Sequence, residues 1–326
     1  LVMLLAVALL SLFSAFRPQS NDSEFDLVGF GNLPVVDRGR AKPLDTYARI
    51  SLMILSNKQT LFMGDNAATS HREHPKEWKK TPATRWLLDV VTKPQIARRY
   101  TVIRIDHPDI LGLLDIQEER MYFSMHELLE HRDVLVQQFE MVQKTNQNDW
   151  TGYQRHVMKL SNRMNLYLSL EGVRGWLLIP PTNPEDITQE WLTLASASLG
   201  PGHGADDGHN HPVPDEFSKE YASALRGAMD AWHDGDVEQF NASVSTATTL
   251  VGDRAASILP KVRAETYFNH SSPFIQTMAL YVMVFILAAL SWLGMSRPLA
   301  RSALWILVLA IIVHTGGLIA RVWIQG

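Results

Sequence analysis

The chain has 326 residues, of which 46% are apolar and 20% are charged, and its formal net charge at pH 7 is -4. It contains no cysteine, which excludes disulfides, thiolate metal sites and covalent haem attachment to this chain. Residues 273–326 carry three arginines and no acidic residue, so residues 17–272 carry 27 basic and 34 acidic residues, a net charge of -7. That acidic balance argues against a nucleic-acid partner.

Three uncharged or nearly uncharged apolar stretches mark the two ends of the chain, at residues 1–16, 273–294 and 302–320. The second and third are long enough to cross a hydrocarbon core of about 30 Å. The first is shorter and predicts a truncated transmembrane anchor, with a signal peptide as the alternative. The pattern predicts a membrane protein in which one N-terminal and two C-terminal transmembrane helices flank a domain at 17–272.

The stretch "MSRPLARS" between the last two apolar segments contains Arg297 and Arg301. Short basic loops stay on the cytoplasmic side of a membrane. The domain at 17–272 and the C-terminus are therefore expected on the extracytoplasmic side.

The domain begins with residues 17–35, which read as extended, with glycines and Pro34 as breaks. From Val36 the sequence "VDRGRAKPLDTYARISL" predicts a turn around Gly39 and then an amphipathic helix that ends near Leu55. Residues 64–82 are polar and read as a loop, and "TRWLLDVV" after them reads as a short helix.

The next segment combines strands and helices. "YTVIRI" at 100–105 predicts a strand, and Asp106 or Pro108 opens a helical turn. "RMYFSMHELLEH" predicts a strand that passes into a helix capped by Ser124, with Glu127 completing a capping box.

The helical pattern then extends from about Arg132 to Leu170, with a break at 146–149. "GWLLIPP" predicts a short strand, and "TQEWLTLASASLG" predicts a helix that stops at Gly200. Residues 201–214 form a linker rich in Gly, Pro, His and Asp, which lacks the apolar residues of a core.

Helices resume from Asp215 to about Phe268, with breaks near Gly235 and Gly252. The domain is therefore expected to be mostly α-helical with a few short strands.

Histidines are the first candidates for a metal site. A surface metal site in the linker competes with a flexible polar loop, and the ligand spacing favours the loop. "HREH" makes a weaker case. These candidate ligands are His203, His209 and His211 with Asp206 and Asp207, and separately His71 and His74. The chain has no nucleophile elbow, phosphate loop, dinucleotide fingerprint or zinc-protease pair, so the domain carries no recognisable catalytic motif.

His314 lies inside the last apolar segment, where an ionisable side chain is costly and usually faces protein or a functional path. Imidazole is also a ligand of haem iron. Gly316 and Gly317 follow it and would let a neighbouring helix or a flat ligand approach closely. The residues alone leave two interpretations open, an interhelical hydrogen bond and a role in ligand binding.

The basic run of the domain contains Arg38, Arg40, Lys42 and Arg49. Such side chains bind carboxylates, including haem propionates. They can equally face anionic lipid head groups, pair with acidic residues of the domain, or stay solvated in a turn. The sequence favours one of these structural roles over contact with a ligand.

Three stretches together resemble a known family. They are "LPVVDRGRAKPLDTYAR" at 33–49, "ETYFNHSSPFIQTMALYVMVFILAAL" at 265–290 and "HTGGLIARVWIQG" at 314–326. The chain is similar to the N-terminal part of the system II cytochrome c biogenesis proteins of the ResB/CcsB–CcsA type. The resemblance covers the ends of the chain, and covers 60–260 only by position and length.

The resemblance implies a multi-pass protein of the bacterial inner membrane that helps to deliver haem for covalent attachment to apocytochrome c. Haem would be the cofactor and His314 the ligand of its iron. Arg321, Arg38, Arg40 and Lys42 would contact the cofactor, and the partners would be apocytochrome c and the remaining CcsA-type haem-handling part or subunit.

The chain departs from the family in one respect. The tryptophan-rich haem segment of these synthetases is absent, and the nine tryptophans are dispersed. The chain is therefore expected to be a fragment or one split subunit of a cytochrome c synthetase, without the complete active site. The alternative function is a membrane-anchored extracytoplasmic scaffold or sensor without haem.

Overall fold

The computed structural model of the chain divides into two compact units, Ser23–Ser257 and a second unit that contains Ile258–Gly326. The structure describes residues 21, 23–63, 69–70, 79–116, 120–173, 175–186, 189–198, 214–294 and 296–326. The expected N-terminal anchor at 1–16, most of the linker at 201–214, and the histidines at 71, 74, 203, 209 and 211 lie outside these residues.

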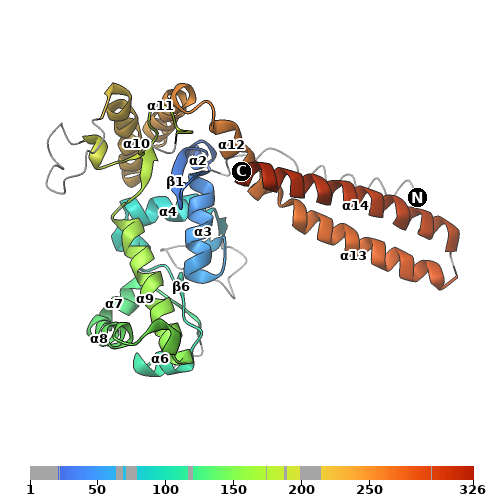
Figure 1. Cartoon of the computed structure of the whole chain (residues 1–326), viewed down its shortest axis with the longest axis horizontal. Helices are drawn as coiled ribbons and strands as arrows, with labels where there is room; N and C mark the ends of the chain where they lie inside the picture. The colour runs from blue at the N-terminus through green and yellow to red at the C-terminus, as the bar shows by residue number, and fades with distance from the viewer. Residues whose placement is uncertain are drawn as a thin grey trace. The chain divides into compact units, whose positions relative to one another are not determined.

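The unit Ser23–Ser257, which we call the domain, is mostly helical with short strands, as the sequence predicts (Figure 1). Its helices are α2 (Leu27–Gly31), α3 (Leu44–Ser56), α4 (Ala83–Thr92), α5 (Pro94–Ala97), α6 (Pro108–Leu113), α7 (Met125–Glu130), α8 (Arg132–Gln143), α9 (Gly152–Glu171), α10 (Glu216–Asp234) and α11 (Val237–Arg254), with 3-10 turns η2 (Gln147–Asp149) and η3 (Ser196–Ser198). Its strands are β1 (Pro34–Asp37), β2 (Arg40–Pro43), β3 (Leu61–Met63), β4 (Thr69–Ser70), β5 (Lys79–Thr81), β6 (Ile103–Arg104), β7 (Tyr122–Phe123), β8 (Leu177–Ile179) and β9 (Leu192–Thr193).

The largest sheet is antiparallel with the strand order β2-β1-β8-β9. Strands β1 and β2 form a hairpin whose two-residue turn, Arg38–Gly39, has φ values of 53° and 76°. Positive φ at both central residues is the turn geometry that matches the twist of paired strands. The predicted turn around Gly39 is therefore confirmed as the tip of a hairpin, and α3 follows β2 directly.

Several predicted helices are confirmed with their caps. The Ser124 hydroxyl accepts a hydrogen bond from the Glu127 amide, and the Glu127 carboxylate accepts one from the Ser124 amide, which is the expected capping box. Helices α3 and α4 form as predicted, and the break between α8 and α9 contains η2.

The expected helix before Gly200 is wrong. Leu192 and Thr193 pair with β8 as strand β9, although "EWLTLASAS" has a helical pattern. The Ser196 hydroxyl accepts a hydrogen bond from the Thr193 amide at 2.9 Å, and the Thr193 hydroxyl accepts one from the Ser196 amide at 3.0 Å. Such local bonds compete with a helix, and the free edge of β8 supplies the strand partner.

Two other segments differ from the expected pattern. The segment 17–35 was expected to be extended, but Leu27–Gly31 forms helix α2 because the Asp26 carboxylate accepts from the Gly29 amide at 2.8 Å. The break expected near Gly252 comes later, since α11 runs to Arg254. Glycine weakens a helix interior but does not have to end it when the helix packs on a neighbour.

Strand assignments were also imprecise. Only Ile103–Arg104 of the predicted strand at 100–105 pairs, because its partner β7 has two residues. In the predicted loop at 64–82, β4 and β5 pair with the two sides of β3.

A buried carboxylate joins three segments of the domain core. Asp89 on α4 is 5% exposed, and its oxygens accept from the Tyr100 hydroxyl at 3.0 Å and from the Trp232 indole on α10 at 2.9 Å. Burial raises the pKa of Asp89, against the hydrogen bonds from Trp232 and Tyr100 and the charges of Arg85 and Lys93. The two aromatic donors replace the water that this carboxylate loses on folding.

The second unit contains α12 (Leu259–Ser271), α13 (Pro273–Trp292) and α14 (Ser296–Gln325). Pro273 begins a new helix, and Ser272 before it adopts a left-handed conformation with φ of 44°. Helices α13 and α14 run side by side as an antiparallel hairpin (Figure 1). Their contact is made by Leu280 and Leu287 against Ala303, Ile306 and Ala310.

Both helices of the hairpin are long and apolar enough to cross a membrane. The span expected at 302–320 lies within the longer helix α14, which begins at Ser296. Arg297 and Arg301 were expected in a loop, but they lie in the first turns of α14, where Pro298 is tolerated because the first turn needs no amide partner.

Asp89 generates a prediction about pH. Because burial raises its folded pKa, the carboxyl contributes most to stability when it is protonated, and that contribution is lost as pH rises through the folded pKa. Asp89→Asn has no carboxyl group to ionise at this position. The melting temperature of the variant should therefore rise relative to that of the wild-type chain as pH increases from about 4 to about 7. Circular dichroism of the full chain in detergent measures the melting temperatures of the variant and the wild-type chain. Asp230→Asn, at an exposed position, is the control. A difference that does not change with pH contradicts the assignment.

Candidate functional site

His314 lies in the contact between the two apolar helices. Its half-buried ring lies 5.7 Å from the ring of Phe274 and 6.0 Å from that of Tyr281, both on α13. The Phe268 ring of α12 meets Phe274 edge-on at 5.8 Å, which extends the aromatic group. We call Phe268, Phe274, Tyr281 and His314 the aromatic cluster.

The two glycines after His314 have different surroundings. A Cβ at Gly317 would lie 3.3 Å from Phe274 and 3.6 Å from Pro273, so this glycine lets α13 approach α14 closely. A Cβ at Gly316 would have no atom within 4 Å. Gly317 thus serves helix packing, whereas Gly316, two residues after His314, lies on the other side of α14.

Arg321 lies seven residues beyond His314 on α14 and is exposed. This spacing puts the two residues on the same face of the helix, about 10 Å apart along its axis. Arg297 and Arg301 lie at the opposite end of α14, and about 30 Å of helix separates Arg301 from Arg321.

The aromatic cluster supplies an imidazole beside aromatic rings, which is the donor chemistry that haem iron would need. Among the described residues of α13 and α14, the imidazole nitrogens of His314 make no hydrogen bond. The rings of Phe274 and Tyr281 lie beside the imidazole, and Gly317, about one turn along the same helix face, lets α13 approach closely there.

The basic run of the domain is largely engaged in internal ion pairs. Lys42 is 8% exposed, and its ammonium lies 2.6 Å from the Asp37 carboxylate. Arg49 binds the Asp45 carboxylate at 2.7 Å, and Asp45 is 2% exposed. The first pair lies within the β1–β2 hairpin and the second within α3, so these cations balance acidic residues of their own segment.

The remaining cations of the run differ in exposure. Arg38 is exposed at the tip of the β1–β2 hairpin, and Arg40 is half-buried beside it. Asp37 also affects Tyr47, whose pKa is raised to about 12 by burial and by the charge of Asp37. The Tyr47 ring meets Trp176 edge-on at 5.2 Å, so the base of the hairpin is a packed surface.

The five predicted cofactor contacts thus fall into two groups. His314 and Arg321 share one face of α14, and Arg38, Arg40 and Lys42 share the β1–β2 hairpin of the other unit. No three His, Asp or Glu side chains gather as a metal-ligand set in the described parts of the chain. The linker and "HREH" histidines lie outside those parts.

One group of cations was not among the residues predicted from the sequence. Arg155, Lys159 and Arg163 recur at a spacing of four on α9, in the sequence "RHVMKLSNR". That spacing puts three cations on one helix face. The spacing of four is the signal in the sequence that predicts this face.

No protein-family model and no curated protein matches the chain. The resemblance to the cytochrome c biogenesis family therefore remains a prediction that rests on the three quoted stretches.

The Lys42–Asp37 pair makes a structural role for Lys42 testable. Lys42→Met leaves the Asp37 carboxylate without its ammonium partner, which should cost about 1–3 kcal/mol of unfolding free energy. Arg38→Gln, at the exposed tip of the same hairpin, should change it by less than about 0.5 kcal/mol. Urea unfolding of the full chain in detergent compares the two. Equal stability of both variants contradicts the structural role.

Proposed function

We propose that the chain is a membrane component of cytochrome c maturation that helps to carry haem to the site where it is joined to apocytochrome c. The observation that carries the proposal is the aromatic cluster, in which the His314 imidazole of α14 lies against the Phe274 and Tyr281 rings of α13. The resemblance of the stretches at 33–49, 265–290 and 314–326 supports it.

Membrane insertion is the first element of the proposal. Helices α13 and α14 have the length and composition of spans. Between Arg301 and Arg321, His314 is the one ionisable side chain of α14, over about the thickness of a hydrocarbon core. An imidazole at that depth needs a partner, and haem iron is a chemically suitable one.

The side of the membrane follows from the arginines. Arg297 and Arg301 flank the short connection between α13 and α14, and short basic connections stay in the cytoplasm of bacteria. The acidic domain would then lie outside the inner membrane, with Arg321 and the aromatic cluster towards that side. Haem held there would be close to extracytoplasmic apocytochrome c.

The chain would act with a partner. One imidazole supplies one axial ligand, and the tryptophan-rich segment of the family is not in this sequence. A CcsA-type part or subunit would supply the remaining haem contacts and the thioether chemistry. Arg321, on the same face of α14 as His314, is the proposed contact for a propionate.

The haem proposal is tested at His314. His314→Gln keeps hydrogen-bonding capacity but is a poor iron ligand. The variant chain, purified with its partner from cells that make c-type cytochromes, should contain less haem and show a shifted Soret band. Cytochrome c maturation should fall while the level of the chain stays constant.

The matched control is His126→Gln, which removes an exposed imidazole of the domain. It should leave haem content, spectrum and maturation unchanged. Full haem and an unchanged spectrum in His314→Gln would rule out iron ligation. The anchored scaffold or sensor without haem would then be the better account.

Orientation is tested separately. A reporter that is active only in the cytoplasm should be inactive when inserted at 201–212. The same reporter inserted at Gly294, between α13 and α14, should be active. The reverse pattern would overturn the orientation and the proposed route of haem delivery.

A further inference from the structure

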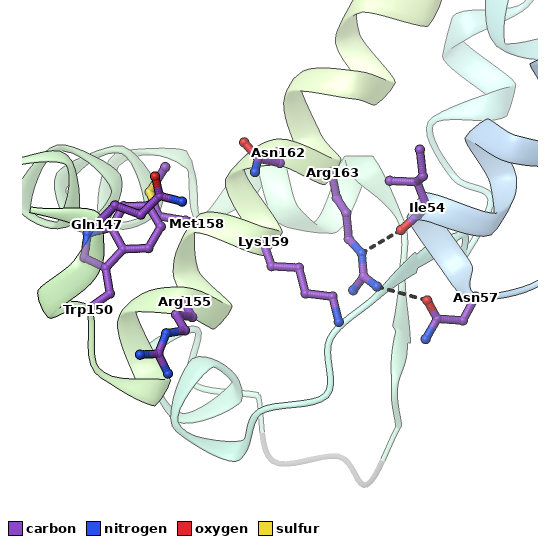
Figure 2. Close-up of a pocket in the computed structure, with 9 residues that line it drawn as sticks. All are labelled: Ile54, Asn57, Gln147, Trp150, Arg155, Met158, Lys159, Asn162 and Arg163. Atoms are coloured by element: carbon purple, nitrogen blue, oxygen red, sulfur yellow. Dashed lines mark hydrogen bonds between the residues drawn. The ribbon is translucent and has the colours of Figure 1, made fainter. Parts of the chain in front are cut away.

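The domain contains a pocket of about 530 Å³ between α9 and the end of α3. Figure 2 shows side chains from α9 along one wall, with Ile54 and Asn57 opposite and Trp150 at one end. This volume lies in the range of small-molecule sites.

The wall formed by α9 is cationic. Arg155, Lys159 and Arg163 all line the pocket, and no carboxylate is among its lining residues. Arg155 makes no ion pair with any residue that the structure describes. Lys159 lies 3.6 Å from the Asp106 carboxylate just outside the lining, and Arg104 binds the same carboxylate. Arg104, Lys159 and Arg163 thus act on a single acid, and Arg155 adds a further positive charge to the pocket wall.

Arg163 fixes the back of the pocket. It is 3% exposed, and its guanidinium donates to the Ile54 carbonyl at 2.8 Å and to the Asn57 side chain at 3.4 Å (Figure 2). It also donates to the Arg104 carbonyl. All three acceptors are neutral, so the positive charge is held in place without a direct carboxylate partner.

The local field lowers the pKa of Asp106. Burial alone would raise its pKa. The hydrogen bond from Arg104 and the charges of Arg104, Lys159 and Arg163 outweigh burial and hold the pKa below its ordinary value. The same field would favour an anion in the pocket.

The rest of the lining is apolar or neutral. Trp150, Met158 and Ile54 supply apolar surface, and Asn57 and Asn162 supply amide groups. The Trp150 indole donates to the Thr145 carbonyl at 3.1 Å, which fixes its ring. An aromatic ring, a thioether and an isoleucine beside two exposed cations suit a ligand with both an apolar body and an anionic group.

We propose that this pocket binds a small amphipathic organic anion, with a phosphate or carboxylate group at Arg155 and Lys159 and its apolar body against Trp150 and Met158. The site lies wholly in the domain and does not depend on haem binding at His314.

Equilibrium dialysis of 1-naphthyl phosphate and of 1-naphthoate against the full chain in nonionic detergent tests the site. At least one probe should bind more tightly than about 1 mM, and added salt should weaken the binding. Inorganic phosphate should bind more weakly than 1-naphthyl phosphate, because it lacks the apolar body.

The variant for comparison is Arg155→Gln with Lys159→Gln, which changes two exposed side chains. It should weaken binding at least about tenfold, while Lys219→Gln, an exposed change on α10, should leave it unchanged. Circular dichroism checks that all variants are folded. Failure of both probes to bind, or equal binding by the double variant, would overturn the proposal. If only the phosphate or only the carboxylate binds, that result identifies the anion class.

Discussion

The buried guanidinium of Arg163 is the interaction on which the arrangement of the domain around α9 depends. It connects α9 to the last turn of α3 through the Ile54 carbonyl, and to β6 through the Arg104 carbonyl. Burial lowers its pKa, against the charge of Asp106, so the protein bears a real desolvation cost at this position. Five donors in a planar fork can satisfy several carbonyls at once, which an ammonium cannot do with the same geometry. This fork therefore joins α9 to the end of α3 at the back of the pocket.

The helical hairpin is governed by a different constraint. Its contact contains small and aliphatic side chains, and the hydroxyls of Thr277, Ser291 and Ser302 donate to carbonyls three or four residues earlier in their own helices. Such internal bonds satisfy polar groups where water is scarce. His314 also lies on this surface, beside the Phe274 and Tyr281 rings, and its imidazole makes no hydrogen bond with the residues that the structure describes.

Sequence patterns predicted those elements whose causes are local. The Ser124–Glu127 capping box, the turn at Arg38–Gly39 and the two apolar helices all follow from a few adjacent residues. The segment around Leu192 did not, because its strand depends on pairing with β8, which is distant in the sequence. Helix α2 was missed for a related reason. Its Asp26 cap is supported by the Asn241 side chain, which accepts from the Asp26 amide at 2.7 Å across 215 positions. No local pattern contains that contact.

The candidate sites divide in the same way. An imidazole inside an apolar segment is visible in the sequence, since its cost comes from composition alone. The ion pairs of the basic run are not visible, because Asp37 and Lys42 meet only when the hairpin register opposes Val35 to Lys42. Four cations close together look like an anion site in the sequence, yet two of them bind carboxylates of the same segment. On α9 the reverse holds. The cations are spread over nine residues, and only the helix brings them to one face. The end of α3, on the opposite side of the pocket, contributes no acidic side chain to its lining. Net charge within a folded surface therefore identifies an anion site more reliably than the density of basic residues along the chain.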